Sequence, residues 1–155
     1  MARTETSATS LEVRKIIAAP PAKVFRAWTD PKAVMRWFPQ EGYEAAQTTI
    51  DLRPGGIYQW GLRKLPDGVP FFSTGKFIEI DAPRRLVCTW RWSGAPETMD
   101  DTVITIEFHD RGASTEVVLR HDRFPDANMR NQHEQGWTLC LAQLETLINK
   151  EEKKR

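Results

Sequence analysis

Residues 126–150, DANMRNQHEQGWTLCLAQLETLINK, contain the pattern that decides the fold. Apolar or aromatic side chains recur there every three or four positions, which places them along one stripe of an α-helix. Asp126, after Phe124-Pro125, is a residue type that caps a helix N-terminus. The sequence therefore predicts a helix about 36 Å long that must pack against another layer. The stripe consists of Met129, His133, Trp137, Cys140, Leu141, Leu144, Leu147 and Ile148.

In the segment before this helix, apolar and polar residues alternate with a period of two, which is typical of half-buried β-strands. Turn-forming combinations such as Pro54-Gly55-Gly56 and Asp110-Arg111-Gly112 separate the candidate strands. Because the connections are short, neighbouring strands must run antiparallel. The strands are predicted at 43–52, 56–64, 71–80, 85–92, 102–109 and 114–121.

The beginning of the chain supplies one more strand and two short helices. A strand is predicted at 11–17, and the prolines at 20 and 21 end it. Proline is tolerated in the first turn of a helix, and Asp30-Pro31 repeats that start signal. Two short helices are therefore expected at about 20–38. We expect residues 1–9 to form a flexible tail, residues 10–150 a single domain, and residues 151–155 a charged tail.

Composition limits the partners and the compartment. The chain has 155 residues, with 22 Lys+Arg against 21 Asp+Glu, so a net charge of +1 gives no electrostatic reason to bind nucleic acid or an anionic membrane. No run of about 18 apolar residues or signal-peptide pattern is present, so no membrane segment is expected. Cys88 and Cys140 are far apart and outside any CxxC pattern, which favours a reducing cytoplasm.

Strand alternation places several large aromatic side chains on one face of the sheet. Trp60, Trp90 and Trp92 are expected on that face, opposite Trp137 of the helix. Several rigid indoles at one interface are difficult to pack without a gap. This favours an aromatic-lined cavity between sheet and helix, in an α+β fold. A solid aromatic core remains the alternative.

Short motifs spread along the chain resemble one family. They are IAAPPAKVFRAWTDP (17–31), WFP (37–39), DLRPGG (51–56), RLVCTW (85–90), HDRFP (121–125) and GW (136–137). Their order and spacing are similar to those of the SRPBCC (START-like) superfamily, in its activator-of-heat-shock-ATPase homologue (AHSA-like) branch. The resemblance covers about residues 9–149.

The resemblance implies a helix-grip fold, in which a curved antiparallel sheet wraps around a long C-terminal helix above a pocket. It implies three functional alternatives: binding of a small apolar or aromatic molecule, a cyclase or hydrolase that uses the same pocket, and an interaction module related to heat-shock chaperone ATPase activators. An interaction module would bind another macromolecule, either a chaperone or a second copy of this chain. Its surface is expected on the outer face of the sheet, as an exposed apolar patch.

No sequence motif for a nucleophile, a nucleotide, a metal or a cofactor occurs. His109 and His121 lie too far apart in the expected strand register to share an ion. His121 and His133 are the candidate polar groups of the pocket, and Tyr58 is a further weak candidate for catalysis. We predict a ligand-binding protein without catalytic residues, metal or cofactor. The expected lining is Trp37, Phe38, Tyr58, Trp60, Phe72, Trp90, Trp92, Trp137 and Leu141.

Overall fold

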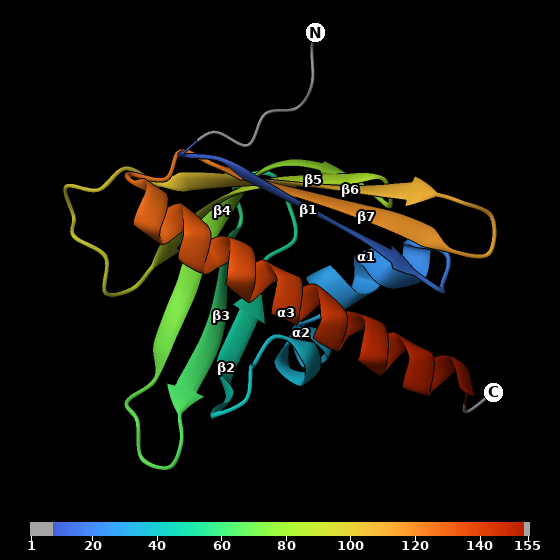
Figure 1. Ribbon diagram of the computed structural model, residues 1–155, viewed down its shortest axis with the longest axis horizontal. Helices are drawn as coiled ribbons and strands as arrows, with labels where there is room; N and C mark the ends of the chain where they lie inside the picture. The colour runs from blue at the N-terminus through green and yellow to red at the C-terminus, as the bar shows by residue number, and fades with distance from the viewer. Residues whose placement is uncertain (1–7, 154–155) are drawn as a thin grey trace, which may run out of the picture.

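The computed structural model describes residues 8–153, which form seven strands and three helices (Figure 1). The strands make one sheet in the order β1-β7-β6-β5-β4-β3-β2, and every neighbouring pair is antiparallel. The predicted α+β helix-grip fold is confirmed. The elements are β1 (Leu11–Ile17), α1 (Pro21–Thr29), α2 (Pro31–Trp37), β2 (Tyr43–Ile50), β3 (Ile57–Lys64), β4 (Phe71–Asp81), β5 (Arg85–Trp92), β6 (Thr102–Asp110), β7 (Thr115–Asp122) and α3 (Ala127–Lys153).

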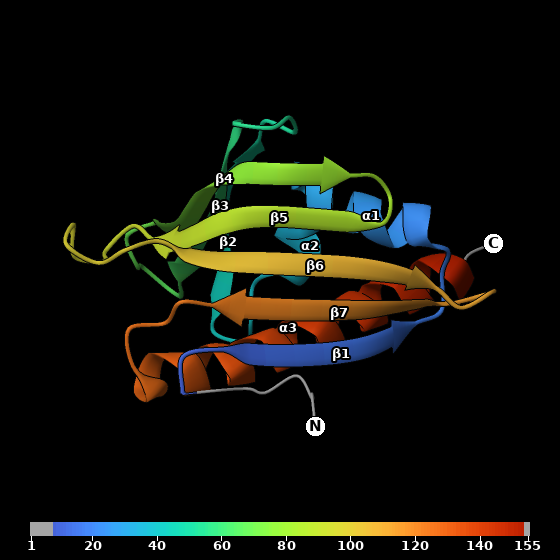
Figure 2. The ribbon, with the colours of Figure 1, turned by 90° about the horizontal axis from the view of Figure 1, so that it is seen from above.

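The sheet curls strongly, and α3 crosses its inner side. Figure 1 shows β2 and β3 turned away from the layer formed by β1, β5, β6 and β7, with α3 running between the two parts. Seen from above, β4 to β7 and β1 lie side by side, and α3 runs beneath β7 and β1 (Figure 2). The register shifts between Ala46 and Thr49 in β2 and between Phe77 and Glu79 in β4. Such bulges bend a strand and increase its twist, which accounts for the curl.

The helix boundaries follow from their caps. The carboxylate of Asp30 accepts a hydrogen bond from the Lys32 amide at 3.0 Å, and that of Asp126 accepts one from the Met129 amide at 2.8 Å. Both capping residues are the predicted ones. Helix α3 continues past the predicted end at 150, so the expected charged tail is helical to Lys153. The expected N-terminal tail lies largely outside the described residues.

The interior of the molecule is filled by indoles. Trp28 of α1 lies at the centre, with its ring centroid 4.7 Å from that of Trp37, 5.9 Å from Trp60 and 5.8 Å from Trp137. The space left between these rings and the sheet is a void of about 20 Å³. A deep empty cavity is therefore not what the structure shows, because Trp28 enters it from α1.

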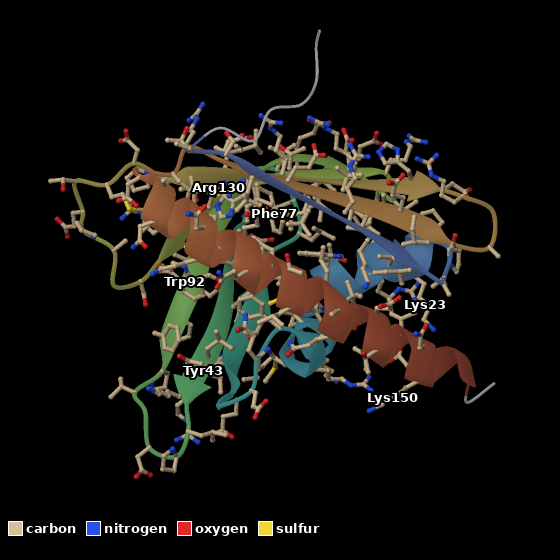
Figure 3. All side chains as sticks on the ribbon, viewed as in Figure 1. Lys23, Tyr43, Phe77, Trp92, Arg130 and Lys150 are labelled. Carbon is tan, nitrogen blue, oxygen red and sulfur yellow. The ribbon has the colours of Figure 1, made fainter. Side chains whose placement is uncertain are left out.

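The outer face of the sheet is charged. Cross-strand ion pairs join Arg14 to Glu116 and Arg85 to Glu107, with N–O distances of 3.4 and 2.6 Å. Figure 3 shows nitrogen- and oxygen-tipped side chains crowded over this face. Exposed Ile16 stands on β1, whereas exposed Ile57 and Ile78 stand on the neighbouring strands β3 and β4. The β1 to β6 part of this face is therefore mostly charged, and the expected apolar patch stays a prediction, with Ile57 and Ile78 as its candidates.

None of the helices within residues 8–153 combines the length and the apolar character needed to cross a membrane.

Candidate functional site

An open groove of about 380 Å³ lies between the N-terminal half of α3 and strands β2 to β5. Figure 3 shows the labelled Trp92 and Tyr43 on the side of α3 that faces these strands. Its walls are aromatic and aliphatic, with three glutamines and one histidine as the polar side chains near α3. No charged side chain of residues 8–153 lines it. The lining residues are Phe38, Gln40, Tyr43, Leu62, Phe71, Trp90, Trp92, Gln132, His133, Gln135, Gly136, Trp137, Leu139 and Cys140.

The structure distributes the predicted lining residues over three places. Four of them border the groove: Phe38, Trp90, Trp92 and Trp137. The void is bordered by Trp90 and Trp137 again, together with Tyr58 and Trp60. Trp37, Phe72 and Leu141 border neither space.

Phe72 is replaced in the groove by its neighbour Phe71. In the β3–β4 register, Phe71 lies opposite Leu62 and Phe72 lies opposite Gly61. Directly opposite residues share a face, and Leu62 lines the groove, so Phe72 points to the other side of the sheet. With two consecutive phenylalanines at the start of a strand, the sequence alone did not decide which one faces inward.

Sequence reasoning also missed the polar rim of the groove. Gln132, Gln135 and Leu139 repeat at spacings of three and four along α3, beside the apolar stripe. This helical spacing could have indicated that the three side chains share one face of α3. Gln40 and Tyr43 come from the loop after α2 and the start of β2. Nothing in the local pattern indicated that this loop would close one end of the groove.

Glutamine side chains fix the loop after α2 to α3. The Gln143 amide donates to the carbonyl oxygens of Trp37 and Pro39, at 2.7 and 3.0 Å. The Gln40 amide donates to the Gly136 carbonyl at 3.4 Å. These bonds hold Phe38 against the groove without introducing a charge.

His121 lies at the centre of a buried hydrogen-bonded chain and is fully buried. Its Nδ1 accepts from the Trp137 indole at 3.1 Å, and its Nε2 lies 2.7 Å from the Thr102 hydroxyl, which itself donates to the Trp90 carbonyl at 2.7 Å. Since that hydroxyl proton is already used, His121 must be the neutral tautomer with its proton on Nε2. Burial, and secondarily the charge of nearby His133, hold the pKa of His121 well below its ordinary value of 6.5.

His133 has the opposite tautomer. Its Nδ1 lies 2.9 Å from the Met129 carbonyl and must donate to it, while its Nε2 accepts from the Trp92 indole at 2.8 Å. Burial lowers the pKa of His133 from 6.5, opposed by the bond to the Met129 carbonyl. The ring centroids of His121 and His133 are 5.5 Å apart. The sequence did not show that these two histidines would meet.

The geometry leaves little for acid–base chemistry. Both nitrogens of each of these histidines are engaged, so His133 can act as a base in the groove only by giving up the Trp92 bond. Tyr58 is buried and donates to the Thr89 carbonyl, and burial raises the pKa of its phenol well above 10. No three His, Cys, Asp or Glu side chains of residues 8–153 gather as metal ligands. In the observed register His109 lies opposite Glu116 and His121 opposite Ile104, so those two histidines are apart.

Comparison with known proteins supports the same fold and defines the family. A solved structure from Chromobacterium violaceum is 26% identical, with a TM-score of 0.80 over 90% of this chain and 96% of that one. A structure from Nitrosomonas europaea is 25% identical, with a TM-score of 0.78 over 93% and 96%. An Hsp90 activator from Plasmodium falciparum, 23% identical, shares the fold with a TM-score of 0.74 over 91% and 96%.

No curated protein matches the sequence. The family model described as activator of Hsp90 ATPase homolog 1-like protein matches residues 18–149, which is most of the chain. The chain therefore belongs to this AHSA1-like family.

Proposed function

We propose that the protein binds a small, uncharged, largely aromatic molecule in the groove between α3 and strands β2 to β5. The observation that carries this proposal is the groove itself, with a volume of about 380 Å³ and no charged lining side chain. Ligand pockets are typically about 300–1,000 Å³, mostly apolar, with a few polar groups that orient the ligand.

The groove presents neighbouring aromatic rings in edge-to-face and tilted arrangements. The ring centroids of Trp90 and Trp92 are 5.4 Å apart at an interplanar angle of 84°, and those of Phe71 and Trp92 are 5.7 Å apart. A flat ring placed between such walls gains about 25 cal/mol for each Å² of apolar surface removed from water. Gln40, Gln132 and Gln135 supply hydrogen bonds at the rim that give the ligand its orientation.

Two adjacent phenylalanines provide the test. Phe71→Ala should weaken the binding of a flat aromatic probe such as fluorenone at least fivefold, because Phe71 lines the groove. Phe72→Ala should leave the affinity within twofold, because Phe72 lies on the other face of the same strand. Isothermal titration calorimetry on both variants, with folding checked by circular dichroism, measures the difference.

Equal losses of affinity in the two variants would place the binding site elsewhere. Failure of the unmodified protein to bind any member of a broad panel of uncharged aromatic compounds would contradict the proposal as a whole.

The comparisons favour a second candidate, action on a chaperone ATPase. Its support is the description of the family and the Plasmodium falciparum structure of the same fold. The direct measurement is the ATPase rate of a purified Hsp90-type chaperone with and without this protein. An unchanged rate over a range of protein concentrations would rule this candidate out.

We further propose a reducing cytoplasm as the compartment. The support is that both cysteines, Cys88 and Cys140, are free thiols buried in the fold.

A further inference from the structure

The indole N–H groups of the molecule differ in whether they have an acceptor. Those of Trp37, Trp92 and Trp137 donate to the Ala27 carbonyl, to His133 and to His121. The N–H groups of three other indoles are buried and have no acceptor within residues 8–153. These three are Trp28, Trp60 and Trp90.

The three indoles without acceptors share one place. All of them line the void of about 20 Å³ behind the groove. A buried donor without a partner carries the full cost of its lost hydration, which is why such groups are rare in folded proteins. Because all three residues border one void, an acceptor atom that enters this void is the partner these N–H groups are best placed to meet. The volume is enough for one oxygen atom and too small for a ring.

The void and the groove share a wall. Trp90 and Trp137 line both spaces, so these two rings separate them. Trp137 is held in place by its bond to His121 at 3.1 Å, whereas the Trp90 side chain makes no hydrogen bond. Of the two rings, Trp90 is therefore the one that is held by packing alone, with no hydrogen bond to fix it.

We propose that the ligand is an aromatic molecule with a hydrogen-bond acceptor on one edge and no donor there, such as a ring ketone, and that its oxygen enters the void. This inference rests on the proposed binding function. The ring system occupies the groove, and the carbonyl oxygen passes Trp90 and accepts from the unpaired indole N–H groups. The acceptor is neutral, because neither space has a cationic side chain to balance a buried anion.

Three tricyclic compounds of one shape test the acceptor. Fluorenone carries a carbonyl oxygen, fluorene carries no polar group, and carbazole carries a donor. We expect fluorenone to bind about tenfold more tightly than fluorene, since a single hydrogen bond contributes about that factor. Carbazole should bind no more tightly than fluorene. The measurement is calorimetric titration of the full chain with each compound.

Nitrogen-15 NMR of the indole N–H groups identifies the atoms involved. Fluorenone should move the signals of Trp28, Trp60 or Trp90 downfield, as hydrogen bonding does, and fluorene, which has the same outline but no acceptor, should not. The Trp37 signal is the internal control, because its N–H is already bonded to Ala27. Trp60→Phe should reduce the preference for fluorenone, while Trp37→Phe should preserve it.

The outcomes separate this inference from the proposed function. Equal affinities for fluorenone and fluorene, without a fluorenone-specific indole shift, would overturn the inference and leave ligand binding intact. Binding of none of the three would count against the binding function as well. A long-lived water detected beside these N–H groups, and retained when fluorenone is bound, would show that the void is a water site and would also overturn the inference.

Discussion

Gly136 leaves an open edge on α3 where the helix faces the groove. A Cβ atom built at this position would meet only the Gln40 amide nitrogen, at 3.6 Å, which is an ordinary van der Waals contact. Glycine inside a helix costs about 1 kcal/mol relative to alanine. This glycine is therefore not needed for packing, and the space beside it belongs to the groove.

Gly136→Ala should consequently separate stability from binding. We expect the free energy of unfolding to rise by about 1 kcal/mol in urea titrations. The added methyl group projects into the groove, so the affinity for fluorenone should fall severalfold in calorimetry. An unchanged affinity would mean that the ligand does not reach this part of α3.

His121 and His133 connect the stability of the protein to pH. Both are held neutral in the folded state, with pKa values below the ordinary 6.5. In the unfolded chain they take up protons near pH 6.5, so the unfolded state binds more protons below that value. The stabilisation is fully present above pH 6.5 and is lost as the pH falls toward the lower folded values.

The free energy of unfolding should therefore decrease between pH 6.5 and pH 5.5, by up to about 1 kcal/mol for each of the two histidines. Urea titrations at several pH values measure this slope. His133→Gln should make the slope shallower, because one titrating group is removed. A slope that is the same in the variant would assign the pH dependence to other groups.

Single residues also show where sequence reasoning reaches its limit. Alternation correctly placed Tyr58, Trp60 and Trp90 on the inner face, since a regular strand fixes which side chains share a face. It did not distinguish Phe71 from Phe72, because the small inward residues Ser73 and Gly75 that follow weaken the apolar pattern. The meeting of His121 with His133 depends on how α3 docks, which no local pattern contains.

The strands and helices themselves were predictable to within a few residues. Turn residues such as Pro54-Gly55-Gly56 and the capping residue Asp30 mark the boundaries by local chemistry. The curvature of the sheet was harder to predict, since it depends on the bulges in β2 and β4 and on close approaches between strands. A Cβ atom at Gly75 in β4 would lie 1.9 Å from the Thr89 carbonyl oxygen of β5, so only glycine fits at this contact.

Gly75→Ala should therefore destabilise the protein by about 1–3 kcal/mol, because β4 must move away from β5. Gly94→Ala is the matched control, since a Cβ atom at Gly94 would meet nothing within 4 Å. Thermal unfolding of the two variants measures the difference. If Gly75→Ala were as stable as Gly94→Ala, the close approach of the two strands would not be a feature of the folded protein.

At the scale of the whole molecule, the interior is one continuous core from α1 and α2 to the C-terminal part of α3. Trp28 closes the space that the indole-rich sheet face led us to expect as a cavity. The sequence predicted the set of large rings but not their fit, because the volume left between sheet and helix depends on the docking of every element. Around Trp28 the interior is therefore a solid aromatic core, which was the alternative expectation. Open space remains at the groove beside the N-terminal half of α3 and in the small void behind it.

The two cysteines report on the opening of this core. Burial raises the pKa of Cys88 to about 12 and that of Cys140 to about 11, so neither is a thiolate at pH 8. We expect no rapid reaction of the folded protein with a thiol reagent at that pH, and two reactive thiols after unfolding in urea. Rapid reaction of one thiol in the folded protein would show that α3 separates from the sheet without global unfolding.

The contact between neighbouring indoles also has an optical consequence. Trp90 lies 5.1 Å from Trp137 and 5.9 Å from Trp60, measured between ring centroids, and Trp28 continues the chain of rings. At such separations the excited state migrates from ring to ring before it emits, so the tryptophans behave as a single antenna. A molecule in the groove that quenches the fluorescence of Trp90 will therefore also reduce the emission of Trp60, Trp137 and Trp28. The emission intensity will report that the site is occupied, but it will not identify the ring in contact with the ligand.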